Sequence, residues 1–275
     1  MTGPDWLEIR RGEAPLLVSL PHTGTDIPPD IEDRLVSPWL ARKDADWWID
    51  RLYGFAASLG ATTVRTAVSR TVVDVNRDPS GASLYPGQAT TELCPTTTFD
   101  GEPLYRPGAA LAPGEVEERR ARWFDPYHAA LDAEVARLKA RHGRVVVYDC
   151  HSIRSIVPRL FDGRLPVFNI GTNGGASCAP ALAEDVAALC RGTGRSVVVD
   201  GRFRGGFITR RLGRPADGVH AIQMELACRA YLDEPEGAVS EADWPPPYDP
   251  AHAAPVRDAL EAILRRCRAV AGEPA

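Results

Sequence analysis

The stretch Val145-Val146-Val147-Tyr148 runs directly into Asp149-Cys150-His151-Ser152, and it decides the fold class. A short run that is nearly all valine predicts a strand buried on both faces of a sheet. The polar residues that follow mark the carboxyl end of that strand. Because ligands of open α/β sheets bind outside the carboxyl ends of strands, the stretch predicts a functional site as well as a strand.

Outward from this stretch, short apolar runs alternate with longer stretches of helical character. Further strands are predicted over residues 16–20, 61–75, 167–170, 196–200 and 220–226. Helices are predicted over residues 39–59, 113–141, 178–191 and 253–271. Such alternation implies parallel pairing and a sheet covered by helices on both faces. We therefore predict an α/β fold in a single domain over residues 1–275, with the valines at 196–199 also buried on both sides.

Composition excludes several classes of protein. The 275 residues are 44% apolar and 25% charged, as in an ordinary globular chain, and the net charge of −5 argues against a nonspecific grip on nucleic acid. No apolar run approaches the roughly 18 to 20 residues that cross a bilayer. Asp5 and Glu8 stand where a signal peptide would be apolar. We expect a cytoplasmic protein with no membrane or nucleic-acid partner; a monomer and a homo-oligomer are both compatible with the sequence.

Six scattered cysteines form no C-x-x-C pair, and we expect reduced, mostly buried thiols. Cys150 precedes His151, and core packing is the interpretation we favour over a nucleophile. The segment 78–114 is rich in Pro, Gly and Thr, and an irregular loop of that length is usually functional or mobile. The sequence leaves open whether it forms a lid or packs rigidly.

Two histidines follow predicted strands. His22 lies in Pro21-His22-Thr23-Gly24 after the run at 16–20, and His151 follows the valine strand. A catalytic zinc takes three protein ligands and keeps one open position, so a carboxylate should complete the set. Asp46 is our candidate, with Asp44 and Asp26 as alternatives. Acidic residues in a first helical turn also complement the helix dipole, which is the simpler explanation for Asp44.

The densest polar cluster is Ser69-Arg70-Thr71-Val72-Val73-Asp74-Val75-Asn76-Arg77-Asp78. Strand alternation would turn Asp74 and Asn76 to one face, with Arg70 and Arg77 at the two ends. Guanidinium groups beside an asparagine can clamp a carboxylate and polarise a carbonyl. A solvated edge strand is the alternative. Asp149 is a candidate partner for a metal-bound imidazole, although adjacent strand residues point to opposite faces, so its role stays open.

Two more segments supply candidates. In the segment 202–211 the pair Gly205-Gly206 lies beside Thr209 and Arg210, which could bind a second carboxylate; a surface hairpin is the alternative. Glu225 lies inside the apolar run His220-Ala221-Ile222-Gln223-Met224-Glu225-Leu226. A buried carboxylate is unfavourable unless it is paired or used, so Glu225 is a candidate general base, or else the partner of an arginine.

Together these motifs resemble the N-formylglutamate amidohydrolase family of bacterial histidine degradation. The resemblance spans roughly residues 15 to 230 and includes Asp44-Ala45-Asp46-Trp47, Phe168-Asn169-Ile170-Gly171-Thr172 and the motifs above. The family is similar in fold to zinc carboxypeptidases and aspartoacylases, which implies a central mixed, mostly parallel sheet. In those relatives a D-x-N-R segment grips substrate and a D-x-H segment supplies a zinc ligand. Their H-x-x-E pair is absent, because Thr25 stands three residues after His22.

The resemblance implies hydrolysis of N-formyl-L-glutamate to formate and L-glutamate. One divalent metal, zinc or alternatively manganese, iron or cobalt, would be held by three residues: His22, Asp46 and His151. Glu225 would take a proton from the metal-bound water, and Arg70 or Arg77 would stabilise the oxyanion. The expected substrate-binding residues are Asn76, Arg77, Asn169, Thr209 and Arg210. Alternatives are another small N-acylamino-acid amidase or carboxypeptidase on this scaffold, or a non-catalytic binding or regulatory protein.

Overall fold

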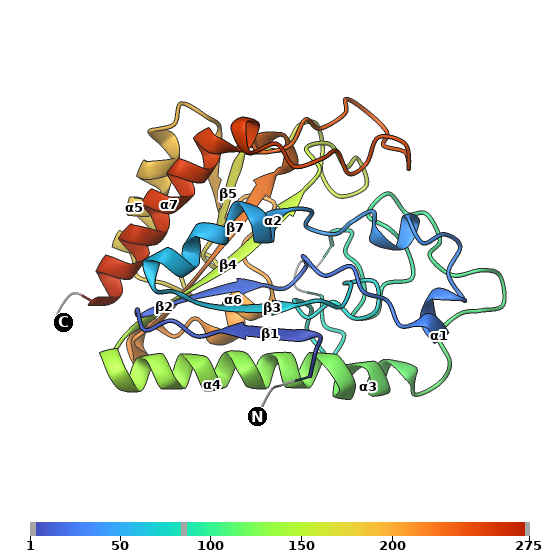
Figure 1. Ribbon diagram of the computed structural model, residues 1–275, viewed down its shortest axis with the longest axis horizontal. Coiled ribbons are helices and arrows are strands. Elements are labelled where there is room, and N and C mark those ends of the chain that lie inside the picture. Colours follow the sequence, from blue (N-terminus) through green and yellow to red (C-terminus); the bar gives the residue numbers. More distant parts are fainter. Residues whose placement is uncertain (1–3, 84–86, 273–275) are drawn as a thin grey trace.

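The computed structural model describes residues 4–83 and 87–272, which are built around a seven-stranded sheet (Figure 1). Its central strand is β4 (Val145–Ile153), in which the side chains of Val145, Val146, Val147 and Tyr148 have no exposed surface. The valine run is therefore confirmed as a fully buried strand. It continues further than predicted, and His151 belongs to the strand itself.

The strand order across the sheet is β1-β3-β2-β4-β7-β5-β6. β3, β2, β4 and β7 run parallel, whereas β1 pairs antiparallel with β3, and β5 pairs antiparallel with β7 and parallel with β6. The expectation of a mixed, mostly parallel sheet is confirmed. The remaining strands are β1 (Leu7–Arg10), β2 (Leu16–Leu20), β3 (Thr62–Thr66), β5 (Phe168–Gly171), β6 (Val197–Val199) and β7 (Val219–Ala227).

Helices cover both faces of the sheet in one α/β domain (Figure 1). α4 (Asp125–His142) and α6 (Phe207–Leu212) pack on the face that carries Val145 and Val147. α5 (Pro180–Arg191) and α7 (Pro250–Gly272) pack on the opposite face, against Val146 and Tyr148. α3 (Glu115–Arg119) leads through a π-helical turn, Arg120–Phe124, into α4, which confirms the long helix predicted here. Short elements elsewhere are α1 (Pro29–Glu32) and the 3-10 turns Pro215–Asp217 and Cys228–Ala230.

The helix predicted over residues 39–59 is wrong as a continuous element. Asp44 and Asp46 lie in a turn rather than in a first helical turn, and the backbone amide of Asp46 donates to the carbonyl of His22 at 2.9 Å. This long-range bond draws the chain toward the sheet and interrupts the helical pattern. What remains helical is the 3-10 turn Leu40–Arg42, α2 (Ile49–Leu52) and the 3-10 turn Gly54–Leu59.

The strand predicted over residues 61–75 ends at Thr66. Residues 69–77 form turns, and every side chain from Ser69 to Asn76 is buried, so the strand and the solvated-edge alternative are both wrong here. A short local bond explains the change, because Asp74 Oδ1 accepts the backbone amide of Asn76 at 2.9 Å. Side chains that satisfy nearby amides favour turns over strands. The predicted separation holds, because Val73 and Val75 lie in the core whereas Asp74 and Asn76 contact histidines.

Two other predictions about local structure are corrected. β6 lies at the edge of the sheet, and Val199 is 38% exposed, so this strand is not buried on both sides. Gly205 and Gly206 do not form a hairpin but lead into α6. Gly205 has a φ of +106°, and a Cβ on Gly206 would collide with the side-chain amide of Asn76. The glycine pair thus allows the backbone to approach the site closely.

All six cysteines are free and buried, as expected. Burial raises the pKa of the Cys150 thiol well above its ordinary value, which supports core packing over a nucleophilic role. Within the described ranges, no helix combines the length and apolar character that a membrane span requires. The long loop that was predicted from 78 to 114 includes residues 84–86, which lie outside the described part of the chain.

Candidate active site

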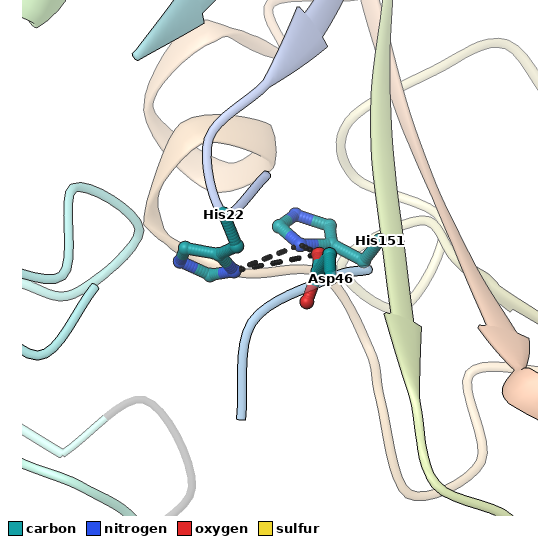
Figure 2. Close-up of side chains that lie close together, drawn as sticks. All are labelled: His22, Asp46 and His151. Atoms are coloured by element: carbon teal, nitrogen blue, oxygen red, sulfur yellow. Dashed lines mark hydrogen bonds and ion pairs between the residues drawn. The ribbon is translucent and has the colours of Figure 1, made fainter. Parts of the chain in front are cut away.

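The site forms where three neighbouring parallel strands end. His22 follows β2 by two residues, His151 lies two residues before the end of β4, and Glu225 lies opposite His151 on β7. Asp46 arrives from the turn that its backbone bond to His22 fixes. Figure 2 shows His22, Asp46 and His151 converging from these separate segments; we call these three residues the metal corner.

The donor atoms of the metal corner lie within 4.8 Å of one another, and all three residues are buried. His151 Nδ1 is 3.1 Å from His22 Nδ1 and 3.2 Å from Asp46 Oδ2. His22 Nδ1 is 3.7 Å from the same carboxylate oxygen. Two imidazole nitrogens and a carboxylate therefore face one point.

The opposite edges of both imidazoles are held by carboxylates. His22 Nε2 is 2.7 Å from Asp74 Oδ1, and His151 Nε2 is 3.1 Å from Asp149 Oδ2. Because an ionised carboxylate only accepts hydrogen bonds, the contact with Asp74 places a proton on His22 Nε2, and in both rings the Nδ1 atom faces the metal corner. Asp149 and His151 are two residues apart on β4, so they share a face, which resolves the open role of Asp149 as an orienting partner.

This arrangement calls for a positive charge between the two Nδ1 atoms. Burial alone would raise the pKa of Asp46, but the two imidazoles lower it well below its ordinary value. Burial would lower the pKa of His151, yet Asp149 and Asp46 raise it well above the ordinary value. In addition, Asp46 Oδ1 is buried without a hydrogen-bond partner in the described ranges. The donor set and its charge balance fit a divalent metal ion in place of a proton.

Of the three candidate carboxylates, only Asp46 reaches both histidines in the described structure. Asp44 instead accepts the backbone amide of Phe99 at 2.6 Å and pairs with Arg154 at 3.5 Å. Asp26 is exposed on a bridge to Val68.

Asn76 braces the metal corner from the side. Its Nδ2 lies 3.4 Å from Asp149 Oδ2 and 3.0 Å from His151 Nε2. Its Oδ1 accepts the backbone amide of Ile208, the second residue of α6, at 2.8 Å, which fixes the orientation of the amide group. Helix α6 and the turn at 69–77 are thereby tied to the end of β4.

Glu225 is buried beside the metal corner with an uncharged neighbour. Gln223, two residues earlier on the same face of β7, donates from Nε2 to Glu225 Oε2 at 3.2 Å. Gln223 Oε1 in turn accepts the amide of Gly206 at 2.7 Å. Burial raises the pKa of Glu225 to about 8. A carboxyl bonded to an amide, with a pKa in this range, is suited to proton transfer rather than to a structural ion pair with arginine.

The metal corner opens onto a cavity whose wall contains three arginines, Arg70, Arg77 and Arg202. Arg70 Nη2 donates to Asp74 Oδ2 at 2.6 Å, and its guanidinium lies 4.6 Å from the centre of the Phe99 ring. Arg77 donates to the carbonyl and the hydroxyl of Thr91, both at 3.1 Å. The loop at 87–104 thus supplies part of the wall.

Three other predicted substrate-binding residues, Asn169, Thr209 and Arg210, are not part of the cavity wall that the described residues form. Thr209 is buried within α6, and Arg210 Nε donates to the carbonyl of Gly205 at 2.8 Å. Asn169 Nδ2 donates to the carbonyls of Pro166 at 2.8 Å and Glu225 at 3.1 Å. Their contact with substrate stays a prediction.

The sequence did not select Arg202, Asp74 or Phe99 as site residues, although Arg202 and Phe99 line the cavity and Asp74 holds His22. Arg202 belongs to the segment 202–211 that was singled out, but Arg210 was chosen there, because nothing in the pattern says which arginine faces the cavity. Asp74 carried a signal, since it opens the D-x-N-R motif. Phe99 carried none, because its place depends on the bond from its amide to Asp44.

The sequence matches a known protein family over most of its length. A model of the N-formylglutamate amidohydrolase family matches residues 14–232. An N-formylglutamate deformylase of Pseudomonas aeruginosa is 48% identical over 94% of this chain and 96% of its own length. A protein of the same name from Pseudomonas putida is 46% identical over 84% of this chain and 86% of its own length.

Two solved structures share the fold. The crystal structure of an N-formylglutamate amidohydrolase from Ralstonia eutropha JMP134 has a TM-score of 0.76 at 25% identity, covering 96% of this chain and 97% of that one. A protein from Agrobacterium tumefaciens has a TM-score of 0.70 at 18% identity, covering 98% and 97%. With the family match over most of its length, this chain belongs to the N-formylglutamate amidohydrolase family.

Proposed function

We propose that this protein is a metal-dependent amidase that hydrolyses N-formyl-L-glutamate to formate and L-glutamate. The observation that carries the proposal is the metal corner, placed beside Glu225 in a cavity that contains three arginines. The Pseudomonas relatives named N-formylglutamate deformylase support the choice of substrate. A place in histidine degradation is part of the same proposal and rests on the family resemblance alone.

Zinc is the metal we assign to His22, Asp46 and His151, because three protein ligands with an open position are typical of catalytic zinc sites. Bound there, the ion would lower the pKa of a water molecule and polarise the formyl carbonyl. Manganese, iron and cobalt accept the same types of ligand, so elemental analysis of the purified protein decides between them.

Glu225 is assigned the role of general base. The parallel register of β4 and β7 places it opposite His151, at the edge of the metal corner. Its carboxylate takes a proton from the attacking water, and the oxygen bonds to the formyl carbon. Glu225 then returns the proton to the glutamate nitrogen as the carbon–nitrogen bond breaks. Formate and L-glutamate leave.

The two arginines next to the metal corner are assigned to different negatively charged groups of the substrate. Arg70 is fixed by Asp74 and by the ring of Phe99, so it can stabilise the oxyanion without reorganising. Arg77 and Asn76 are assigned to the α-carboxylate. That group is attached one carbon away from the reacting nitrogen, and Arg77 Nε lies only 3.7 Å from Asp74 Oδ2, close to the metal corner.

The test is formate release from N-formyl-L-glutamate by the purified protein, before chelation, after chelation and after Zn²⁺ is restored. The proposal predicts loss and recovery of activity. Unchanged activity after complete metal removal would contradict the metal's role. Hydrolysis of other N-acylamino acids but not of N-formyl-L-glutamate would make the protein a different amidase, and no hydrolysis by the metal-loaded protein would favour a binding protein.

A further inference from the structure

Of the three arginines in the cavity wall, the proposed reaction employs only Arg70 and Arg77. Arg202 enters the wall from a different segment, the loop between β6 and α6. Three guanidinium groups in one small cavity are unexpected in a protein whose net charge is −5. Guanidinium groups that enter the wall from two separate segments fit a substrate with more than one carboxylate.

Two loops hold Arg202 in position. Its Nε donates to the carbonyl of Leu160 at 2.7 Å, and its Nη2 donates to the carbonyl of Ala89 at 2.8 Å. Its guanidinium also lies 5.3 Å from the centre of the Phe203 ring. Both carbonyl acceptors are neutral, so they orient the guanidinium without adding a full negative charge. A cation oriented in this way loses little conformational freedom when it binds a carboxylate.

We infer that Arg202 is the specificity-determining residue that binds the side-chain carboxylate of a dicarboxylic N-acylamino acid. The α-carboxylate lies near the reacting amide and falls to Arg77, beside the metal corner. The side-chain carboxylate is attached two carbons farther from the reacting nitrogen than the α-carboxylate, so it needs a cation in another part of the cavity, and Arg202 is anchored there in the loop wall. The inference rests on the proposed function for the identity of the substrate.

Arg210 provides the direct rival, since the sequence pattern assigned it this second carboxylate. Arg210 lies on α6, and its Nε donates to the carbonyl of Gly205. Arg210 is not part of the cavity wall that the described residues form. The two assignments can therefore be told apart, because each predicts that substitution of a different arginine weakens the reaction with the same substrate.

The experiment compares N-formyl-L-glutamate with its neutral isostere N-formyl-L-glutamine. Arg202→Gln should lower kcat/KM for N-formyl-L-glutamate at least about 30-fold, mainly through KM, and should change the value for N-formyl-L-glutamine by less than about threefold. Arg204→Gln is the matched control, because Arg204 is exposed two residues away. It should change neither value.

Equal losses on both substrates, or no loss on N-formyl-L-glutamate, would overturn the inference. A selective loss in Arg210→Gln but not in Arg202→Gln would assign the role to Arg210 instead. Calorimetric binding of L-glutamate and L-glutamine separates this inference from the proposed function, because it needs no turnover. If the unaltered protein releases no formate, selective weakening of L-glutamate binding in Arg202→Gln still supports the inference, and equal binding of both amino acids by the unaltered protein contradicts it.

Discussion

Asp46 in the metal corner and Glu225 at the end of β7 are both buried carboxylates, but they meet different neighbours. Asp46 lies between two imidazoles, and they lower its pKa although burial opposes the shift. Glu225 bonds to the amide of Gln223, and burial raises its pKa to about 8. The neighbouring charge, rather than burial alone, decides which carboxylate is a ligand and which can carry a proton.

Two buried histidines also differ in the direction of their pKa shifts, because their neighbours differ in charge. His151 lies between Asp149 and Asp46, which raise its pKa although burial opposes the shift. His128 on α4 bonds through Nε2 to a neutral acceptor, the carbonyl of Val75, at 2.8 Å, and burial lowers its pKa to about 4. The metal corner therefore attracts positive charge, whereas the buried site of His128 disfavours it.

The largest effect is expected from Glu225→Gln, which removes the proton carrier but keeps the shape of the side chain. We expect kcat for N-formyl-L-glutamate to fall about 10³-fold with little change in KM. Steady-state kinetics measures both values, and the metal content should match that of the unaltered protein. A kcat within about tenfold of the unaltered value would remove Glu225 from the reaction.

Smaller effects on the kinetics are expected from the two arginines beside the metal corner, and each should change a different constant. Arg70→Gln should lower kcat about 10²-fold, since it removes a preset donor to the oxyanion. Arg77→Gln should instead raise KM for N-formyl-L-glutamate, because its assigned contact is the α-carboxylate. The same kinetic assay reports both, and an exchange of these two effects would reverse the assignments.

Asp74→Asn tests how far the metal affinity of the site depends on the carboxylates that orient its histidines. Loss of the carboxylate that holds His22 should weaken metal affinity by about 10- to 100-fold. Competition with a zinc chelator measures this change. Asp26→Asn is the control, because that carboxylate is exposed, and equal affinity losses in both variants would contradict the role of Asp74.

The smallest effect is expected from His128→Gln, which should change how the free energy of unfolding depends on pH. The unfolded chain binds a proton at this histidine below about pH 6.5, and the folded protein binds one only below about pH 4. The unfolded state therefore binds more protons between these values, and acidification destabilises the protein. His128→Gln should reduce the loss of unfolding free energy between pH 7.5 and 5 by roughly 1–2 kcal/mol.

Urea unfolding at the two pH values measures this difference. His252→Gln is the matched control, since His252 is exposed on α7, and its pH dependence should equal that of the unaltered protein. An unchanged pH dependence in His128→Gln would mean that the buried histidine is not the cause.

The central strands were predictable because their patterns are local. Residues 16–20 match β2, and the valine run at 145–148 begins β4, so both histidines could be placed at strand ends. The turn at 69–77 could not be predicted, because valines and polar residues alternate there as they would in a strand.

The choice among candidate residues depended on contacts far apart in the chain. Asp46 is selected over Asp44 by a backbone bond to His22, and Asp44 is drawn instead to Phe99. Arg202 is aimed by carbonyls of two distant loops, at Leu160 and Ala89. No spacing in the sequence encodes these pairings.

The most direct test of the account is the metal content of the purified protein, measured by elemental analysis and by calorimetric titration of the chelated protein with Zn²⁺. The account predicts one ion per chain for the unaltered protein and none for His151→Ala, with the folded state of both confirmed by near-UV circular dichroism. A folded, unaltered protein that binds no divalent ion, or a His151→Ala variant that retains the ion, would contradict it.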